Sequence, residues 1–389
     1  MPEVAARLNN LPPYVFSVIG DEIRQLQAQG HDVIRLDIGS PDMPPPPHVI
    51  EALAQSARQP NKHGYSGYRG SPAFRQAVAN YYKQRFGVDL DPDKEVLPLI
   101  GSKEGLVNIA LAYLDKGDIS LVPDIAYPSY ALGTRMAGAE PFFVPLIHEK
   151  GFLPDLQAVP KDVAQKAKLL WVNYPNNPTG ATASLEDYQE IINYCAAHDI
   201  LLVSDNPYCD VTFDGFVAPS ILQIDNAKSH AVEFMSFSKT FNMAGWRLGA
   251  AVGSAQALEA LLRIKSNIDS GHFLSIYDAG IAALEETPVE WLQERNACYA
   301  QRRDLILDTL PQIGLEAEKP KASLYVWAKV LQGDALEYTQ RLRSEAFVSI
   351  APGEAYGPGG RGYVRISLGV PDDRLAMALE RMKRWFNDN

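Results

Sequence analysis

The chain has 389 residues with 36 Lys or Arg and 47 Asp or Glu, which give a formal net charge of −11. This acidic balance argues against binding along a nucleic-acid backbone, which needs clustered basic surface. No apolar run approaches the roughly 18 residues that a membrane span requires. Residues 1–7 do not resemble a secretory signal, so we expect a cytoplasmic protein.

The three cysteines, Cys195, Cys209 and Cys298, are widely spaced and lack a Cys-x-x-Cys pair. We therefore expect neither disulfides nor a structural zinc site. The seven histidines form no pair with metal-ligand spacing, and no metal site is predicted.

Apolar runs alternate with helical periodicity from about residue 45 to residue 280. This alternation predicts a mainly parallel sheet with helices on both faces. The predicted helices cover residues 48–57, 72–86, 103–114, 185–198 and 255–269. The predicted strands cover residues 96–100, 119–122, 169–172, 200–203, 231–235 and 248–252.

The pattern changes beyond residue 287. Here the sequence predicts a helix to about residue 310, a strand at 323–330, a helix near 335–345 and a last helix at 372–386. With an N-terminal helix at 14–29, these elements predict a smaller α+β domain. The proline cluster at 44–47 marks a boundary. We therefore predict a large domain at 45–285, a small domain formed by 1–44 and 286–389, and a site between them that closure could shield from water.

A lysine stands where one of the predicted strands should end. The segment Ser236-Phe237-Ser238-Lys239 follows the apolar run 231–235. An amine there can form an imine with a carbonyl if its neighbours lower its pKa or hold an aldehyde close. The serine hydroxyls and the nearby Arg247 are groups that anchor a phosphate ester. Together they suggest pyridoxal phosphate, although Ser-x-Ser-Lys alone is a weak signal because most lysines are surface charges.

Two other element ends carry compatible chemistry. Asp205 follows the predicted strand 200–203, where open α/β sheets bind ligands, and its carboxylate could keep a pyridine nitrogen protonated. The alternative is that Asp205 caps the following turn. Ser102 begins a predicted helix whose exposed amides could bind phosphate. The alternative for Ser102 is a helix N-cap without a ligand.

The same residues also fit unrelated patterns. Ser236 to Lys239 fits Ser-x-x-Lys, and Ser204-Asp205-Asn206 fits Ser-Asp-Asn, both signatures of serine β-lactamases and penicillin-binding proteins. Their order is reversed here and no Lys-Thr-Gly occurs, so we do not expect acyl transfer. The run 357–362 is a formal Gly-x-Gly-x-x-Gly, but a strand-like run and no helix follows it, so we expect a loop.

The motifs match one family in order and spacing. Two more belong to the set, Asn173-Tyr174-Pro175-Asn176-Asn177-Pro178-Thr179-Gly180 and Gly245-Trp246-Arg247-Leu248-Gly249. From Leu11 to the final helix, the chain resembles the class I and II aminotransferases, the fold type I pyridoxal-phosphate enzymes. The resemblance implies an α/β fold with a mainly parallel sheet of the seven-stranded type, flanked by helices, plus a smaller α+β domain. It also implies pyridoxal 5'-phosphate as the cofactor.

The resemblance implies a role for each matching residue. Lys239 is similar to the lysine that forms the Schiff base and then transfers the proton, and Asp205 to the partner of the pyridine nitrogen. The other implied cofactor residues are Asn177 and Tyr208 at the ring hydroxyl, Tyr127 on the ring face, Ser102, Lys103 (through its amide), Ser236, Ser238 and Arg247 at the phosphate, and Tyr65 reaching the phosphate of a neighbouring subunit. The implied substrate residues are Arg365 as the fork for the α-carboxylate, with Gly39, Asn177 and Tyr14.

This family implies transfer of an amino group between an L-amino acid and a 2-oxo acid by a ping-pong mechanism in a homodimer. The segment 265–271 is similar to the branch that contains LL-diaminopimelate aminotransferases, so LL-diaminopimelate with 2-oxoglutarate is one candidate pair. Alanine or aspartate as the donor, and a C–S β-lyase activity, stay open. A non-catalytic sensor within a transcription regulator would need a DNA-binding domain, which we expect the residues before Leu11 not to supply.

Overall fold

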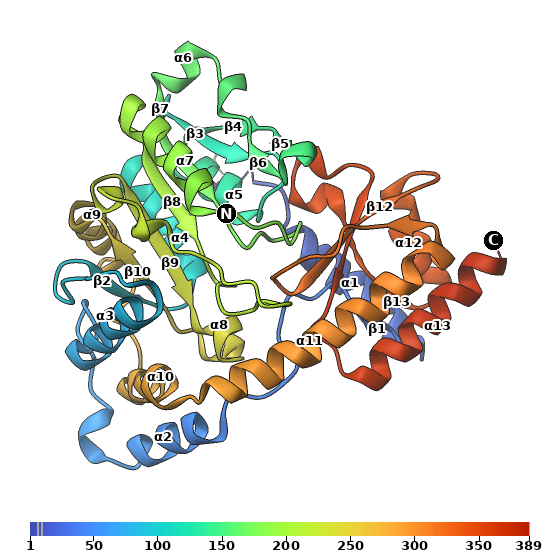
Figure 1. Cartoon of the computed structure of the whole chain (residues 1–389), viewed down its shortest axis with the longest axis horizontal. Coiled ribbons are helices and arrows are strands. Elements are labelled where there is room, and N and C mark those ends of the chain that lie inside the picture. Colours follow the sequence, from blue (N-terminus) through green and yellow to red (C-terminus); the bar gives the residue numbers. More distant parts are fainter. Residues whose placement is uncertain (6–7, 9–10, 389) are drawn as a thin grey trace.

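The computed structural model describes residues 1–5, 8 and 11–388 and contains a large and a smaller sheet, each packed with helices (Figure 1). Residues 6, 7, 9, 10 and 389, which belong to the leading segment and to the predicted small domain, lie outside the described residues. The long helix α11 (Val289–Thr309) runs from the side of the large sheet to the smaller one (Figure 1). In the described part of the chain, no helix is both long and apolar enough to cross a bilayer.

The large sheet has seven strands in the order β2-β10-β9-β8-β7-β3-β4. Every neighbouring pair is parallel except the two made by β10, which is antiparallel to both β2 and β9. The predicted mainly parallel, seven-stranded sheet is therefore confirmed. The strands are β2 (Val96–Leu99), β3 (Ile119–Pro123), β4 (Glu140–Val144), β7 (Ala167–Val172), β8 (Leu201–Asp205), β9 (Ala231–Ser236) and β10 (Gly249–Gly253).

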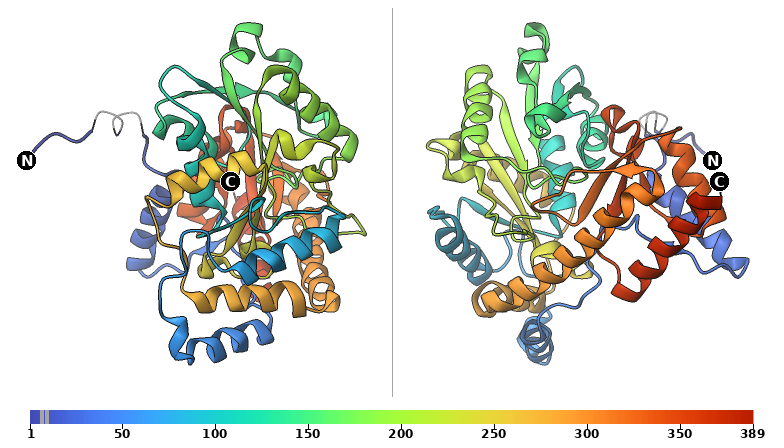
Figure 2. Two further views of the ribbon diagram at one scale, coloured as in Figure 1. Left: turned by 90° about the vertical axis from the view of Figure 1, so that its left-hand side faces the viewer. Right: turned by 45° about the vertical axis from the view of Figure 1, so that its right-hand side comes forward.

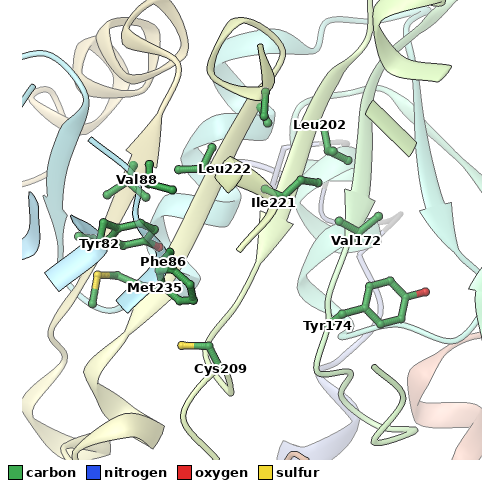
Figure 3. Packing of buried hydrophobic residues seen from close by; sticks show 14 of the residues in the cluster. Tyr82, Phe86, Val88, Val172, Tyr174, Leu202, Cys209, Ile221, Leu222 and Met235 are labelled. Carbon is green, nitrogen blue, oxygen red and sulfur yellow. The ribbon is translucent and has the colours of Figure 1, made fainter. Parts of the chain in front are cut away.

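Helices cover both faces of this sheet because its strands are apolar on both sides. Leu202 of β8 belongs to the core cluster shared with α3, α7 and α10, whereas the next residue, Val203, belongs to the cluster shared with α4, α5 and α9. Figure 3 shows the cluster that contains Leu202, in which Leu202 and Val172 point to the same face from adjacent strands. The helices are α2 (Pro47–Ala57), α3 (Pro72–Phe86), α4 (Ser102–Tyr113), α5 (Ser129–Met136), α6 (Lys161–Ala164), α7 (Leu185–His198), α8 (Phe237–Thr240), α9 (Ala255–Lys265) and α10 (Leu274–Glu286).

Local sequence signals explain where these helices begin and end. Ser184 and Asp187 form a reciprocal capping box at the start of α7. The hydroxyl of Ser71 accepts the Phe74 amide at 3.3 Å at the start of α3, and Gly87 ends that helix with a φ of 72°. These signals account for the agreement of α3 and α7 with the predicted ranges.

The smaller sheet has the order β11-β12-β15-β14 and packs on α11, α12 and α13 around a separate apolar cluster. A short parallel pair, β1 with β13, brings the segment that follows α1 to this part of the molecule. The elements are α1 (Val15–Ala28), β1 (Ile34–Arg35), β11 (Leu315–Glu316), β12 (Tyr325–Val330), α12 (Ala335–Glu345), β13 (Val348–Ser349), β14 (Ala351–Pro352), β15 (Tyr363–Ser367) and α13 (Asp372–Asp388). The hairpin of β5 (Leu146–Ile147) and β6 (Leu153–Pro154) pairs with neither of these sheets.

Residues 1–5 are exposed and extend away from the body of the molecule (Figure 2). The predicted domain limits, 45–285 against 1–44 with 286–389, stay a prediction. The two apolar clusters on the large sheet and the separate cluster around β12 are compatible with that division.

Candidate active site

A cavity of about 450 Å³ lies where the central strands end and the smaller sheet begins. Asp205 and Ser236 are the last residues of the adjacent parallel strands β8 and β9, so both meet at one edge of the sheet. Arg365 comes from β15 of the smaller sheet, and Asp37 and Gly39 come from the segment after β1. Every site residue that the sequence predicts lines this cavity, with the exception of Tyr65.

Lys239 lies in α8, the single turn that follows β9. The Ser236 hydroxyl accepts the Ser238 amide at 3.2 Å, which fixes the start of that turn. The Lys239 amine donates to the carbonyl oxygen of Gly39. Burial, with the positive charges of Arg365 and Arg247, lowers the pKa of this amine to about 7. Near neutral pH about half of the amine is therefore neutral and can act as a nucleophile or base.

Asp205 is buried and keeps one carboxylate oxygen free. Its Oδ2 accepts a hydrogen bond from the hydroxyl of Tyr130 at 2.7 Å, and its Oδ1 has no partner among the described residues. Burial raises the pKa of Asp205 to about 7, and the bond from Tyr130 opposes that shift. The Tyr130 ring stacks on Trp171 with centroids 5.0 Å apart. The turn-cap interpretation of Asp205 is wrong, because its side chain bonds to Tyr130 and to no turn amide.

Arg365 is held in place before any ligand arrives. Its Nη1 donates to Asn177 Oδ1 at 2.8 Å, and its Nη2 donates to the carbonyl oxygen of Asp37 at 2.6 Å. Its Nε is buried and has no partner within the described residues. A buried guanidinium with an unfilled donor fits a carboxylate of a bound molecule. Asn177 is itself fixed, because its amide donates to Asn173 Oδ1 at 2.7 Å.

The start of α4 is a cationic corner of the cavity. Gly101 precedes the helix with a φ of 72°, a backbone conformation that favours glycine, and the Arg247 guanidinium lies beside it. Ser102 is the first residue of α4, and the residue at the cap position, Gly101, has no side chain. The N-cap interpretation of Ser102 is therefore wrong. The free amides of this helix start, with Ser102 and Arg247 beside them, are suited to bind a phosphate.

Tyr127 and Tyr14 form an aromatic wall of the same cavity. The Lys103 ammonium lies 4.3 Å from the ring centroid of Tyr14 and 5.8 Å from that of Tyr127. The sequence predicts a role for the Lys103 amide, and the structure adds that its charged end also lies at the cavity.

Several supporting residues were missed from the sequence. Tyr130, near the start of α5, holds Asp205, and its place three residues after Tyr127 is a local sequence signal that could have found it. Asn173 belongs to a quoted motif, and its side chain donates to the Asp205 carbonyl at 2.6 Å. Tyr325 lines the cavity without any local sequence signal. Arg295 of α11 donates to the carbonyl of Lys239 at 3.0 Å and so ties the turn of Lys239 to the long helix.

Other predicted features fall outside the cavity. Tyr65 is 91% exposed, and its contact with a neighbouring subunit stays a prediction. None of residues 265–271 lines the cavity of the same chain, and Lys265 is paired with Glu104 and Asp269. Ser204 of the Ser-Asp-Asn match is buried, donates to Glu233 at 3.0 Å and does not line the cavity.

The glycine-rich run is a loop, as predicted. Residues 357–362 contain one short 3-10 turn, Pro358–Gly360, and lead into β15 without the helix that a dinucleotide site requires.

Comparison with known proteins assigns the chain to a family. The family model described as aminotransferase class I and II matches residues 31–382. An LL-diaminopimelate aminotransferase from Moorella thermoacetica is 49% identical over 381 residues, which cover 98% of this chain and 97% of that protein. Apo-BacF from Bacillus subtilis superimposes with a TM-score of 0.95 at 35% identity and 99% coverage of both chains. A probable N-succinyldiaminopimelate aminotransferase from Thermus thermophilus has a TM-score of 0.89 at 39% identity, covering 95% of this chain and 99% of that one.

The chain therefore belongs to the class I and II aminotransferases. It is an enzyme that transfers amino groups between amino acids and keto acids, and its fold is the one that the resemblance implies. Enzymes of this family generally depend on pyridoxal phosphate.

The residues of the cavity fit that cofactor. The free Oδ1 of Asp205 would accept a hydrogen bond from a protonated pyridine nitrogen, the cationic start of α4 matches a phosphate, and the Lys239 amine has the depressed pKa that reaction with an aldehyde needs.

Proposed function

We propose that this aminotransferase uses pyridoxal 5'-phosphate to move the amino group of LL-diaminopimelate to 2-oxoglutarate. The observation that supports the cofactor is the cavity, in which the Lys239 amine, the unpartnered Asp205 oxygen and the start of α4 line one space. The substrate is supported by the 49% identity to the Moorella thermoacetica protein over nearly the whole chain.

Each part of the cofactor has residues that would hold it. Lys239 would take its aldehyde, Asp205 its ring nitrogen, and Asn177 with Tyr208 its ring hydroxyl. Tyr127 would lie on the ring, and Ser102, the Lys103 amide, Ser236, Ser238 and Arg247 would surround the phosphate. When bound, the cofactor supplies an aldehyde for the amino group and a ring that withdraws electrons from the substrate α-carbon.

Arg365 would orient the amino acid. Its guanidinium is fixed by Asn177 and Asp37, and its Nε is still unfilled, so the fork is preorganised for an α-carboxylate. Gly39 and Tyr14 line the cavity with it and would complete that end of the site.

Lys239 would move the α-proton. Because the pKa of its amine is lowered to about 7, a large fraction is neutral at physiological pH and can accept a proton. General-base catalysis of this kind contributes ~10²–10⁴-fold to the rate. Asp205, ionised by a cationic partner at Oδ1, would keep a proton on the ring nitrogen during the same step.

The substrate assignment is tested with a panel of donors and acceptors on the purified, cofactor-loaded protein. Donors include LL-diaminopimelate, L-alanine and L-aspartate, with meso-diaminopimelate as a control that differs only in the configuration of one carbon. We expect the highest kcat/KM with LL-diaminopimelate and 2-oxoglutarate, and parallel double-reciprocal lines. A higher kcat/KM with alanine or aspartate would show that LL-diaminopimelate is not the preferred donor. Release of ammonia or a thiol would identify a lyase.

We also propose that the enzyme works as a homodimer. Two loops side by side expose apolar side chains on the large domain: the His63 and Phe273 rings stack with centroids 5.5 Å apart. The exposed residues are Tyr65, Tyr68, Ile268 and Phe273. Such an exposed apolar surface favours an interface, and a second copy is the simplest partner for a soluble enzyme.

Mixing variants tests whether Tyr65 acts across that interface. A Tyr65→Ala protein and a Lys239→Ala protein are each expected to be weakly active or inactive. Heterodimers from refolded mixtures would contain one site with both native residues, so activity should return. No recovery in a mixture that light scattering shows to be dimeric would contradict action across the interface.

A further inference from the structure

One tyrosine that no motif marks contacts three parts of the site. Tyr325 is the first residue of β12, only 1% exposed, and it lines the cavity. In the register of the smaller sheet it lies opposite Ser367, so Arg365 is its diagonal neighbour on the same face of β15. The Arg365 guanidinium carbon lies 4.0 Å from the centroid of the Tyr325 ring.

The hydroxyl of Tyr325 reaches a residue that follows strand β8 of the large sheet. It lies 2.8 Å from the hydroxyl of Tyr208, and the two rings meet edge to face with centroids 5.7 Å apart. Each of these two hydroxyls has a single hydrogen that it can donate. If Tyr208 donates its hydrogen to a ligand, Tyr325 must be the donor within the pair. A hydroxyl that accepts a hydrogen bond is also a stronger donor.

Gly39 completes the set of contacts. A β-carbon at Gly39 would overlap the Tyr325 hydroxyl, and the φ of Gly39 lies outside the left-handed region. Glycine is therefore needed here for space and not for backbone freedom. The carbonyl of this glycine accepts the Lys239 amine, so Tyr325 packs against the segment that holds Lys239.

We propose that Tyr325 is a positioning residue that couples the two halves of the site. Its ring face supports the Arg365 guanidinium for the substrate carboxylate, and its hydroxyl orients and strengthens Tyr208 as a donor to the ring oxygen of the cofactor. This inference rests on the function proposed above. It assigns separate effects to the ring and to the hydroxyl of one residue, and these can be measured separately.

Tyr325→Phe removes the hydroxyl and keeps the ring. With Tyr208 a weaker donor, the cofactor ring oxygen holds a neighbouring proton more tightly. The apparent pKa in the visible absorbance titration of the cofactor-loaded protein should therefore rise by about 0.5 unit. We expect kcat to fall about three- to tenfold, with KM for the amino donor changed less than about twofold, because the support for Arg365 remains.

Tyr325→Leu removes both features, and KM for the amino donor should then rise about tenfold in addition. Tyr299→Phe is the matched control, because Tyr299 is a buried tyrosine of the same apolar cluster whose hydroxyl has no partner within the described residues. It should leave the titration and the kinetics unchanged. If the leucine variant does not fold, the phenylalanine variant alone decides.

The proposal is overturned if Tyr325→Phe matches the wild type in both titration and kcat, or if Tyr299→Phe changes both by the same amount. The wild-type spectrum separates this failure from a failure of the proposed function. A wild-type protein without a titrating visible band would contradict the cofactor assignment, whereas a normal wild-type band with an unaltered Tyr325→Phe variant contradicts only the role of Tyr325.

Discussion

The hydroxyl of Tyr130 donates to Oδ2 of Asp205 at 2.7 Å, while Oδ1 of the same carboxylate has no partner among the described residues. Burial raises the pKa of Asp205 to about 7, and this single bond opposes the rise. Tyr130 therefore controls how much of Asp205 is ionised near neutral pH.

Tyr130→Phe should weaken cofactor binding in a pH-dependent way. Loss of the bond raises the pKa of Asp205 further, so less carboxylate is ionised at pH 6.5. Dissociation constants from absorbance titrations should increase about tenfold at pH 6.5 and far less at pH 9. Tyr338→Phe is the control. It removes a hydroxyl that donates to the Ile313 carbonyl in the apolar cluster around β12, and its cofactor binding should show no such pH dependence. Equal weakening at both pH values would contradict this role.

Lys239→Met should alter how the stability of the cofactor-free protein depends on pH. The pKa of Lys239 is about 7 when folded and near its ordinary 10.5 when unfolded. A group whose pKa is lower in the folded state contributes stability at a pH above its unfolded-state pKa. This contribution is lost as the pH falls toward its folded-state pKa. Relative to the methionine variant, the free energy of unfolding of the wild type should increase by on the order of 2 kcal/mol between pH 7 and pH 9. Urea unfolding at both pH values measures this change. The same change in both proteins would contradict the depressed pKa of Lys239.

Arg365→Lys should raise KM for the amino donor about 10- to 100-fold and affect kcat less, because an ammonium cannot form the two-pronged contact with a carboxylate. Arg302→Lys is the control: Arg302 is also buried and bonds to Asp42 and Asp372, but it does not line the cavity. Steady-state kinetics of both variants with one donor decide. An unchanged KM in the Arg365 variant would remove it from the carboxylate site.

Gly39→Ala should lower kcat about tenfold or more, because the new methyl group would displace the Tyr325 hydroxyl or the Gly39 carbonyl that holds Lys239. Gly20→Ala is the control, since its β-carbon would meet only the flexible end of Arg24 at 3.5 Å within α1. Turnover by Gly39→Ala that equals turnover by Gly20→Ala would show that the close approach has no consequence.

The apolar runs of the sequence were enough to locate the central strands. The predicted strands 169–172 and 231–235 lie within β7 and β9, because strands buried on both faces carry continuous apolar residues. The insertion of β10 antiparallel between β2 and β9 was not predictable, since strand order depends on long-range pairing. Helix α10 was missed because Phe273 at its cap position has no capping side chain. Helix α9 ends at Lys265, four residues before the predicted end.

For the site, the strand-end residues Lys239 and Asp205 were predictable, since parallel strands bring their carboxyl ends to one edge. The contacts that tune them were not. Tyr325 reaches the cavity from a different sheet, and the free atoms of Asp205 and Arg365 become visible only when every neighbouring donor and acceptor is placed.

The attachment point of the cofactor can be measured on the loaded protein. The loaded protein is reduced with borohydride, digested and analysed by mass spectrometry. We expect one modified peptide, which carries the pyridoxyl group on Lys239, and none in the Lys239→Ala variant. A label on another lysine, or an unlabelled Lys239 in protein that retains cofactor and activity, would contradict it.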